Sequence, residues 1–264
     1  QDFLDENMPL YQNIVSNFYK ALVDSKFRDE LEKDWGKQIF TLAELQLKTF
    51  SEEIISDLIK ENKLVTEYDK LIASAKIQFE GKERNLSQMT PFMQSKDRLK
   101  RKEAYDTYIG FFKENESKLD EIYDELVKVR TNMAKKLGYE NYVEMGYYRM
   151  SRSDYDAEMV ANYRKQVYED LVPVVTELKN RQKERLGLDE LKYYDEPLEY
   201  LTGNATPKGE PEWILENGKK MYKELSKETH EFFTFMVDRE LLDLVSKKGK
   251  MGGGYCTFIS DYKS

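Results

Sequence analysis

Cysteine and histidine are almost absent from this sequence: each occurs once in 264 residues, as Cys256 and His230. A single cysteine excludes a disulfide within the chain, which fits a reducing compartment, so we expect a cytoplasmic protein. A His-Glu-x-x-His zinc helix needs two histidines, and although His230 and Glu231 match its first two positions, Thr234 occupies the fifth. The sequence therefore contains no two-histidine metal site, and we expect His230 to lie at the surface or at a helix end.

Long apolar runs and basic blocks are also missing. No uninterrupted apolar stretch approaches the roughly 20 residues that a membrane-spanning helix needs, so we expect no membrane partner. The 42 basic and 50 acidic residues give a formal net charge of -8 that is spread along the chain. Because no basic cluster is present to contact phosphates, we expect no nucleic-acid partner.

Helical periodicity dominates what the sequence does contain. Over residues 115–137 apolar side chains recur at steps of three and four, and Gly138 follows where a left-handed residue commonly ends a helix. A further helix that begins near Ser153 must accommodate Pro173, which lacks an amide hydrogen, so we expect a kink or a restart there. Similar patterns predict helices over about 9–34, 36–50, 51–74, 96–113, 141–150, 210–225 and 226–247.

Two short stretches break this helical pattern. Residues 77–80 alternate apolar and polar side chains and Gly81 supplies a turn, which predicts a small hairpin. The run Gly252-Gly253-Gly254 leads into residues 255–259, whose aromatic and β-branched side chains are typical of a strand. We therefore expect a mainly α fold with one small β-hairpin and a short C-terminal edge strand.

The triple glycine has more than one interpretation. A phosphate loop is set aside, because the Gly-Lys-Ser/Thr ending and the following helix are both missing. A strand that begins with glycines can offer its free amide and carbonyl groups to an extended peptide. A flexible turn into an ordinary strand accounts for the same spacing.

Cys256 and His230 also admit a nucleophilic pair, since separation in sequence does not forbid contact in space. No spacing supports this pair specifically. A free cysteine in an apolar strand is more often a small buried hydrophobe, so we expect Cys256 to be buried and its alkylation to leave activity unchanged.

The C-terminal run as a whole resembles a known family. Residues 250–264, Lys-Met-Gly-Gly-Gly-Tyr-Cys-Thr-Phe-Ile-Ser-Asp-Tyr-Lys-Ser, are similar to the glycine-led strand that precedes the His-Glu-x-x-His helix in oligoendopeptidase F-type enzymes. The similarity covers essentially the whole chain, because other stretches agree in the same order: residues 42–50, 70–76, 135–142, 193–195 and 202–209.

This resemblance implies a helical zincin-type lobe of a zinc metalloendopeptidase that hydrolyses short peptides. Residues 1–92 would form the N-terminal accessory region with its hairpin, and residues 93–264 would begin the catalytic domain. In the family, zinc is held by the two histidines of the motif and a distant glutamate, and the motif's own glutamate polarises the attacking water. None of these residues has a counterpart here, so we expect a central fragment that binds no catalytic zinc and is inactive alone. The alternative is a helical binding or scaffold module without catalysis.

The resemblance assigns one site to this chain. In related folds, the strand at the lip of the cleft pairs with the substrate backbone. Gly252, Gly253, Gly254 and Tyr255 are accordingly the predicted substrate-binding residues, with Tyr255 walling a side-chain pocket. No catalytic or metal-binding residue is predicted in this chain, and zinc, the cofactor of the parent enzyme, would be held elsewhere.

Overall fold

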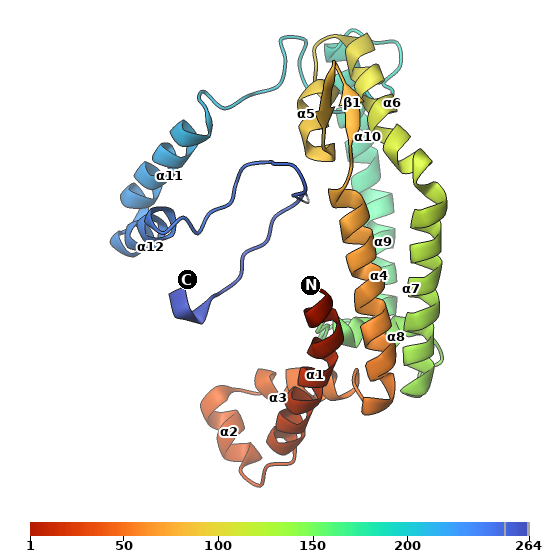
Figure 1. The fold of residues 1–264 in the computed structure, drawn as a ribbon, viewed down its shortest axis with the longest axis vertical. Helices are drawn as coiled ribbons and strands as arrows, with labels where there is room; N and C mark the ends of the chain where they lie inside the picture. Colours follow the sequence, from red (N-terminus) through yellow and green to blue (C-terminus); the bar gives the residue numbers. More distant parts are fainter. Residues whose placement is uncertain (251, 263–264) are drawn as a thin grey trace. The chain divides into compact units, whose positions relative to one another are not determined.

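The computed structural model describes residues 1–250 and 252–262. Most of these residues are helical, and the sheet found among them is a two-stranded antiparallel hairpin (Figure 1), so the predicted mainly α fold with a small hairpin is confirmed. The chain forms two compact units, each built from two stretches: residues 1–71 with 112–178 (unit 1), and residues 72–111 with 179–264 (unit 2). In the described ranges, no helix is both long enough and apolar enough to cross a lipid bilayer.

The elements follow one another with short connections, apart from the long loop between α10 and α11 and the long segment between α12 and the last 3-10 turn. In the first half of the chain they are α1 (Asp2–Val23), α2 (Arg28–Trp35), α3 (Gln38–Leu47), a 3-10 turn (Glu52–Ile54), α4 (Ile55–Ala73), β1 (Ile77–Phe79), β2 (Lys82–Arg84), α5 (Leu86–Met93) and α6 (Arg98–Glu114). The second half contains α7 (Glu116–Lys136), α8 (Tyr142–Arg149), α9 (Ala157–Gln166), a π-helical turn (Val167–Leu171), α10 (Val172–Arg185), α11 (Pro211–Leu225), α12 (Lys227–Asp238) and a 3-10 turn (Ser260–Tyr262).

The core of unit 1 lies where α4, α7 and α8 meet. Its buried side chains are Phe50, Ile54, Leu58, Met133, Ala134 and Met145. Helices α4 and α7 run side by side (Figure 1), and ion pairs along them follow an antiparallel register: Asp57 with Lys136 at 2.6 Å, Lys60 with Glu125 at 2.6 Å and Glu67 with Lys118 at 2.7 Å. Of the apolar stripe predicted over residues 115–137, Met133, Ala134 and Leu137 pack in this core, whereas Tyr123 is 72% exposed.

The single helix predicted over residues 9–34 is wrong, because the structure forms α1 and α2 there. Helix α1 continues through Pro9, whose missing amide leaves the Asp5 carbonyl without its usual helical donor. The side-chain amide of Asn62 donates to that carbonyl instead, at 3.2 Å. The chain then turns at Ser25, whose hydroxyl accepts a hydrogen bond from the amide of Phe27 at 3.2 Å, before α2 begins.

A π-helical turn joins α9 to α10 and ends two residues before Pro173. A proline inside a helix removes one backbone donor and crowds the preceding turn, and the wider π turn accommodates both effects. The perturbation predicted at Pro173 takes this form. The helix itself begins after Asp156, whose carboxylate accepts from the amide of Met159 at 2.9 Å, and not at Ser153.

The hairpin supplies the core of unit 2. Its turn residues Glu80 and Gly81 both have positive φ, 49° and 72°, as a type I′ turn requires. The turn directs Ile77 and Phe79 to one face, where each is only 4% exposed. Both pack with Met89 of α5, so the alternation read from the sequence corresponds to a buried face.

Two helices of unit 2 differ from the prediction. Helix α5 is absent from it, although Asn85 and Gln88 form a capping box in which each backbone amide donates to the other side chain at 2.9 Å. Helix α12 ends at Asp238, well before residue 247. The chain leaves the helix at Glu240, which adopts a left-handed φ of 55° normally favoured by glycine or asparagine.

Candidate functional site

The glycine-led segment lies in unit 2, after the loop that follows α12. Residues 254–259 belong to no helix or strand, so the predicted C-terminal edge strand is not formed. The physical reason is that a strand needs a neighbour to complete its hydrogen bonds, and no described segment pairs with this one. The side chains are open to solvent as well, with Tyr255 and Phe258 exposed by 93% and 72%.

The glycines of this segment have distinct structural roles. A Cβ atom at Gly252 would lie 2.8 Å from the hydroxyl oxygen of Ser87 in α5, so a side chain there would have to displace its neighbour. Gly253 has a φ of 105°, a conformation that residues with side chains rarely adopt. At Gly254 no described atom lies within 4 Å of the corresponding position. The backbone thus approaches α5 at its first glycine and is free at its third.

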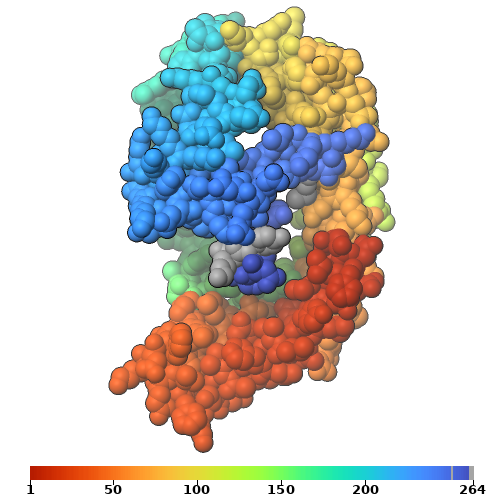
Figure 2. Space-filling model, turned by 60° about the vertical axis from the view of Figure 1, so that its left-hand side comes forward, coloured from red at the N-terminus to blue at the C-terminus, as the bar shows by residue number. Residues whose placement is uncertain are grey.

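The loop before the glycines is closed on itself and tied to α5. The Lys250 ammonium donates to two carbonyl oxygens earlier in the loop, at 2.6 and 3.0 Å. The side-chain amide of Asn85 donates to the Ser246 hydroxyl at 3.2 Å and to the Lys247 carbonyl at 3.3 Å. Figure 2 shows this loop, in blue, at the surface against the orange and yellow chain of the hairpin and α5. Sequence reasoning missed Asn85, because the residues that it joins are 161 positions apart.

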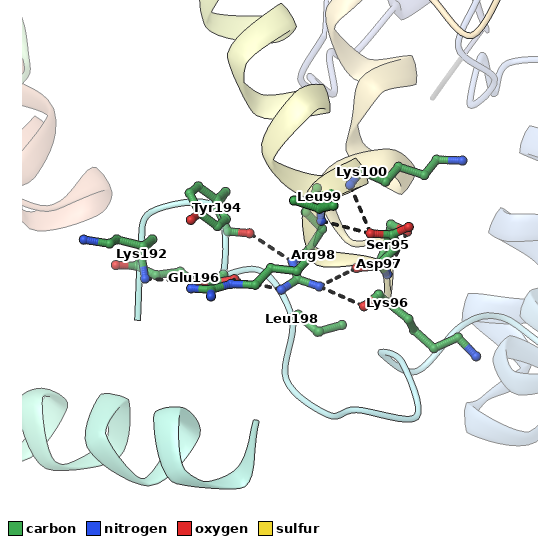
Figure 3. A network of polar contacts seen from close by, with 12 residues as sticks. Ser95, Lys96, Asp97, Arg98, Leu99, Lys100, Lys192, Tyr194, Glu196 and Leu198 are labelled. Atoms are coloured by element: carbon green, nitrogen blue, oxygen red, sulfur yellow. Dashed lines mark hydrogen bonds and ion pairs between the residues drawn. The ribbon is translucent and has the colours of Figure 1, made fainter. Parts of the chain in front are cut away.

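A buried carboxylate fixes the long loop between α10 and α11 in unit 2. Asp195 is fully buried and accepts hydrogen bonds from Arg98 at 2.7 and 3.0 Å and from Arg101 at 2.8 Å. Arg101 also donates to the carbonyl oxygens of Ser95 and Tyr194, at 2.8 and 3.2 Å. Figure 3 shows the surrounding network of polar contacts, with Ser95, Arg98 and Tyr194 labelled. Burial alone would raise the pKa of Asp195, but the hydrogen bonds from Arg98 and Arg101 outweigh it and hold the pKa below its usual value. These contacts hold the loop against α6.

Unit 1 contains a second buried carboxylate. Glu61 of α4 is 3% exposed and accepts from Arg130 of α7 at 2.6 Å and from Arg149 of α8 at 2.8 Å. Arg149 also donates to the Tyr142 hydroxyl at 2.9 Å. Burial opposes ionisation of Glu61, but the hydrogen bonds from Arg149 and Arg130 outweigh it, so the pKa of Glu61 is lowered. The network joins three helices across the core and is structural in role.

Among the described residues, His230 and Cys256 share no hydrogen bond. His230 lies in the first turn of α12, with its Nδ1 atom 3.4 Å from the hydroxyl of Thr234, as a helix-end position predicts. Cys256 is exposed, so its predicted burial is wrong. The strand in which it was expected to be buried is not formed. Across residues 1–250 and 252–262, no three His, Cys, Asp or Glu side chains gather as metal ligands.

A cavity of about 390 Å³ lies in unit 1 between α8 and the start of α9. Tyr147, Tyr148 and Tyr155 form much of its wall. The guanidinium group of Arg152 stacks over the rings of Tyr147 and Tyr155, at 4.6 and 5.4 Å from their centroids. These stacking contacts stabilise the turn between the two helices, and sequence reasoning gave this region no role.

Comparisons with known proteins extend these observations. A model described as Peptidase family M3 matches residues 91–263, and a model described as the Peptidase M3 N-terminal domain matches residues 1–50. No match is found among curated proteins.

Solved structures of similar proteins share the fold over the whole chain. One, PZ peptidase A with inhibitor 2, is 58% identical with a TM-score of 0.97, covering 100% of this chain and 47% of that one. A protein from Bacillus anthracis str. Ames assigned as an oligoendopeptidase F is 60% identical with a TM-score of 0.95, covering 99% of this chain and 48% of that one. Another structure assigned as an oligoendopeptidase F is 57% identical with a TM-score of 0.97, covering 99% of this chain and 46% of that one.

The chain thus spans about half the length of these solved structures. Its helices and hairpin match their helical peptidase lobe. Since one family model accounts for more than half of the sequence, this chain belongs to peptidase family M3.

Proposed function

We propose that this chain is part of a zinc-dependent oligoendopeptidase that hydrolyses short peptides. The observation that carries the proposal is the match of residues 91–263 to peptidase family M3. The names of the similar structures, oligoendopeptidase F and a PZ peptidase A with an inhibitor, support peptides as the substrate class. A cytoplasmic location remains part of the proposal, supported by the single cysteine.

The zinc that the family implies does not fit the residues of this chain. A peptidase zinc site of this type needs two imidazoles from one helix, and here His230 is the only histidine and Thr234 stands where the second would be. These 264 residues alone therefore do not account for a metal-dependent catalytic step. The proposal places the zinc ligands of the parent enzyme outside them and makes the chain alone inactive.

The domain division is proposed on the same basis. Residues 1–92 would be the accessory region with its hairpin, and residues 93–264 would begin the catalytic domain. The two family models support this division, because one ends at residue 50 and the other begins at residue 91.

Gly252, Gly253, Gly254 and Tyr255 are the proposed substrate-binding residues. Residues 254–259 form no ladder with any described segment, which supports a role in pairing with an extended peptide. Main-chain pairing tolerates many substrate sequences, because it uses groups that every peptide carries. Tyr255, whose side chain is 93% exposed, would wall a pocket for a substrate side chain.

The test uses the protein that contains this chain. We expect it to bind zinc and to cleave short quenched-fluorescent peptides faster than a folded protein. A Gly253→Val substitution should raise KM without changing zinc content, because φ of 105° disfavours valine and the backbone would move. Gly36→Val is the matched control: Gly36 also has a left-handed φ, of 84°, but lies between α2 and α3.

Each part of the proposal has its own contrary result. Unchanged KM in the Gly253→Val enzyme would refute a role of the glycine segment in substrate binding. A parent protein that neither binds zinc nor cleaves peptides would refute the proposed function. Zinc binding and peptide cleavage by the 264-residue chain alone would refute the proposal that the zinc ligands lie outside it.

A further inference from the structure

We propose that Asn85 is a positioning residue for substrate: it holds the glycine-led segment in place through the loop of residues 241–250. This inference rests on the proposed function, because it assigns to Asn85 the placement of Gly252 to Tyr255. Asn85 lies between the hairpin and α5 and is only 9% exposed.

The carbonyl oxygen and the amide group of the Asn85 side chain make different contacts. Its carbonyl oxygen accepts from the amide of Gln88 and caps α5. Its amide group donates to the Ser246 hydroxyl and to the Lys247 carbonyl, five residues before Gly252. Asparagine supplies an acceptor and a donor pair on one short side chain, whereas aspartate at neutral pH supplies acceptors alone. An aspartate would therefore cap α5 but release the loop.

Further contacts within the loop carry the positional constraint from Asn85 towards the glycines. Lys250 closes it by donating to the carbonyl oxygens of Asp243 and Val245, at 2.6 and 3.0 Å. A salt bridge of 3.4 Å from Lys248 to Glu83 attaches it to β2. Immediately after the loop, Gly252 lies against the hydroxyl of Ser87, two residues beyond Asn85.

The start of α5 thus bonds to the loop before residue 251 and lies close to the chain after it. Residues 254–259 form no ladder that would hold them, so their direction depends on this anchor. Asn85 is distant in sequence from the glycine-led segment, but its hydrogen bonds to the loop determine where that segment begins.

The decisive variant is Asn85→Asp in the full-length enzyme. It keeps an acceptor for the cap of α5 and removes the two donors to the loop. Asn141→Asp is the matched control, because Asn141 caps α8 by accepting from the amide of Val143 at 2.9 Å and lies far along the chain from this loop.

We expect Asn85→Asp to raise KM for short peptides about tenfold, equivalent to about 1.4 kcal/mol of binding free energy, and to leave kcat and zinc content within about twofold of wild type. Asn141→Asp should leave all three unchanged. A fall in kcat together with loss of zinc in Asn85→Asp would overturn the inference, because it would indicate general structural damage.

A second measurement does not depend on peptidase activity. Limited trypsin digestion should cleave after Lys247 and Lys248 about tenfold faster in Asn85→Asp than in wild type or Asn141→Asp, because the released loop samples extended conformations more often. Equal cleavage rates would overturn the inference whether or not the enzyme hydrolyses peptides. If Gly253→Val raises KM but Asn85→Asp does not, the proposed function stands and the role of Asn85 is refuted.

Discussion

Removing the carboxylate of Glu61 should destabilise unit 1 strongly. Glu61 is 3% exposed, and its two arginine partners reach it from other helices. An alanine there would leave Arg130 and Arg149 facing each other without a counter-charge. Breaking a buried ion pair from one side costs about 3–5 kcal/mol. The Arg149 and Arg130 side chains are 28% and 37% exposed, so water takes up part of the penalty and we expect the low end, about 3 kcal/mol.

The assay is equilibrium unfolding in urea followed by circular dichroism. With a denaturant slope of about 2 kcal/mol per molar, a loss of about 3 kcal/mol lowers the unfolding midpoint by about 1.5 M. Glu125→Ala is the matched control on the same helix pair, because Glu125 bonds Lys60 and Lys128 at the surface and water replaces it readily. If Glu61→Ala lowered the midpoint no more than Glu125→Ala, the view of Glu61 as the charge that joins three helices would be refuted.

The remaining predictions concern the second carboxylate, pH and glycine. Asp195→Asn should lower the free energy of unfolding of unit 2 by about 3 kcal/mol in urea, because the buried charge of Arg101, 2% exposed, would lose its counter-charge; a loss near zero would contradict this. The pKa values of Glu61 and Asp195 are both lowered in the folded protein, so their contribution is complete above the unfolded pKa values of about 4.3 and 3.9 and is lost as pH falls below them. Urea midpoints should thus be flat from about pH 7 to 5 and fall towards about pH 3. Gly138→Ala should destabilise by about 1 kcal/mol because φ there is 86°, whereas Gly110→Ala, inside α6 with open space around it, should stabilise by about 1 kcal/mol; calorimetric shifts of the same sign would refute this.

The parts of the fold that were predicted correctly are those that neighbouring residues decide. The end of α7 at Gly138 and the turn at Gly81 follow from backbone conformations that glycine adopts without strain. The buried face of the hairpin follows from the alternation of apolar and polar side chains alone. Helix α8 begins after Asn141 as expected, with the cap made to Val143.

The parts that could not be predicted depend on partners distant in the sequence. Pro9 lies inside α1 because Asn62, from another helix, satisfies the carbonyl that the proline leaves free. The strand expected at residues 255–259 lacks a partner among the described residues, and no local pattern reveals that. The same holds for Asn85, whose capping role is readable from Gln88 but whose contacts with the loop are not.

The π-helical turn at Val167–Leu171 holds one residue more than a regular α-helical turn. Successive residues of an α-helix are rotated by about 100°, so an extra residue would rotate every side chain that follows unless a wider turn absorbed it locally. Deleting one residue from this turn would therefore let a regular α-helix run from α9 into α10 with both helices keeping their phase. The same deletion inside α10 would instead re-aim the rest of that helix by about 100°.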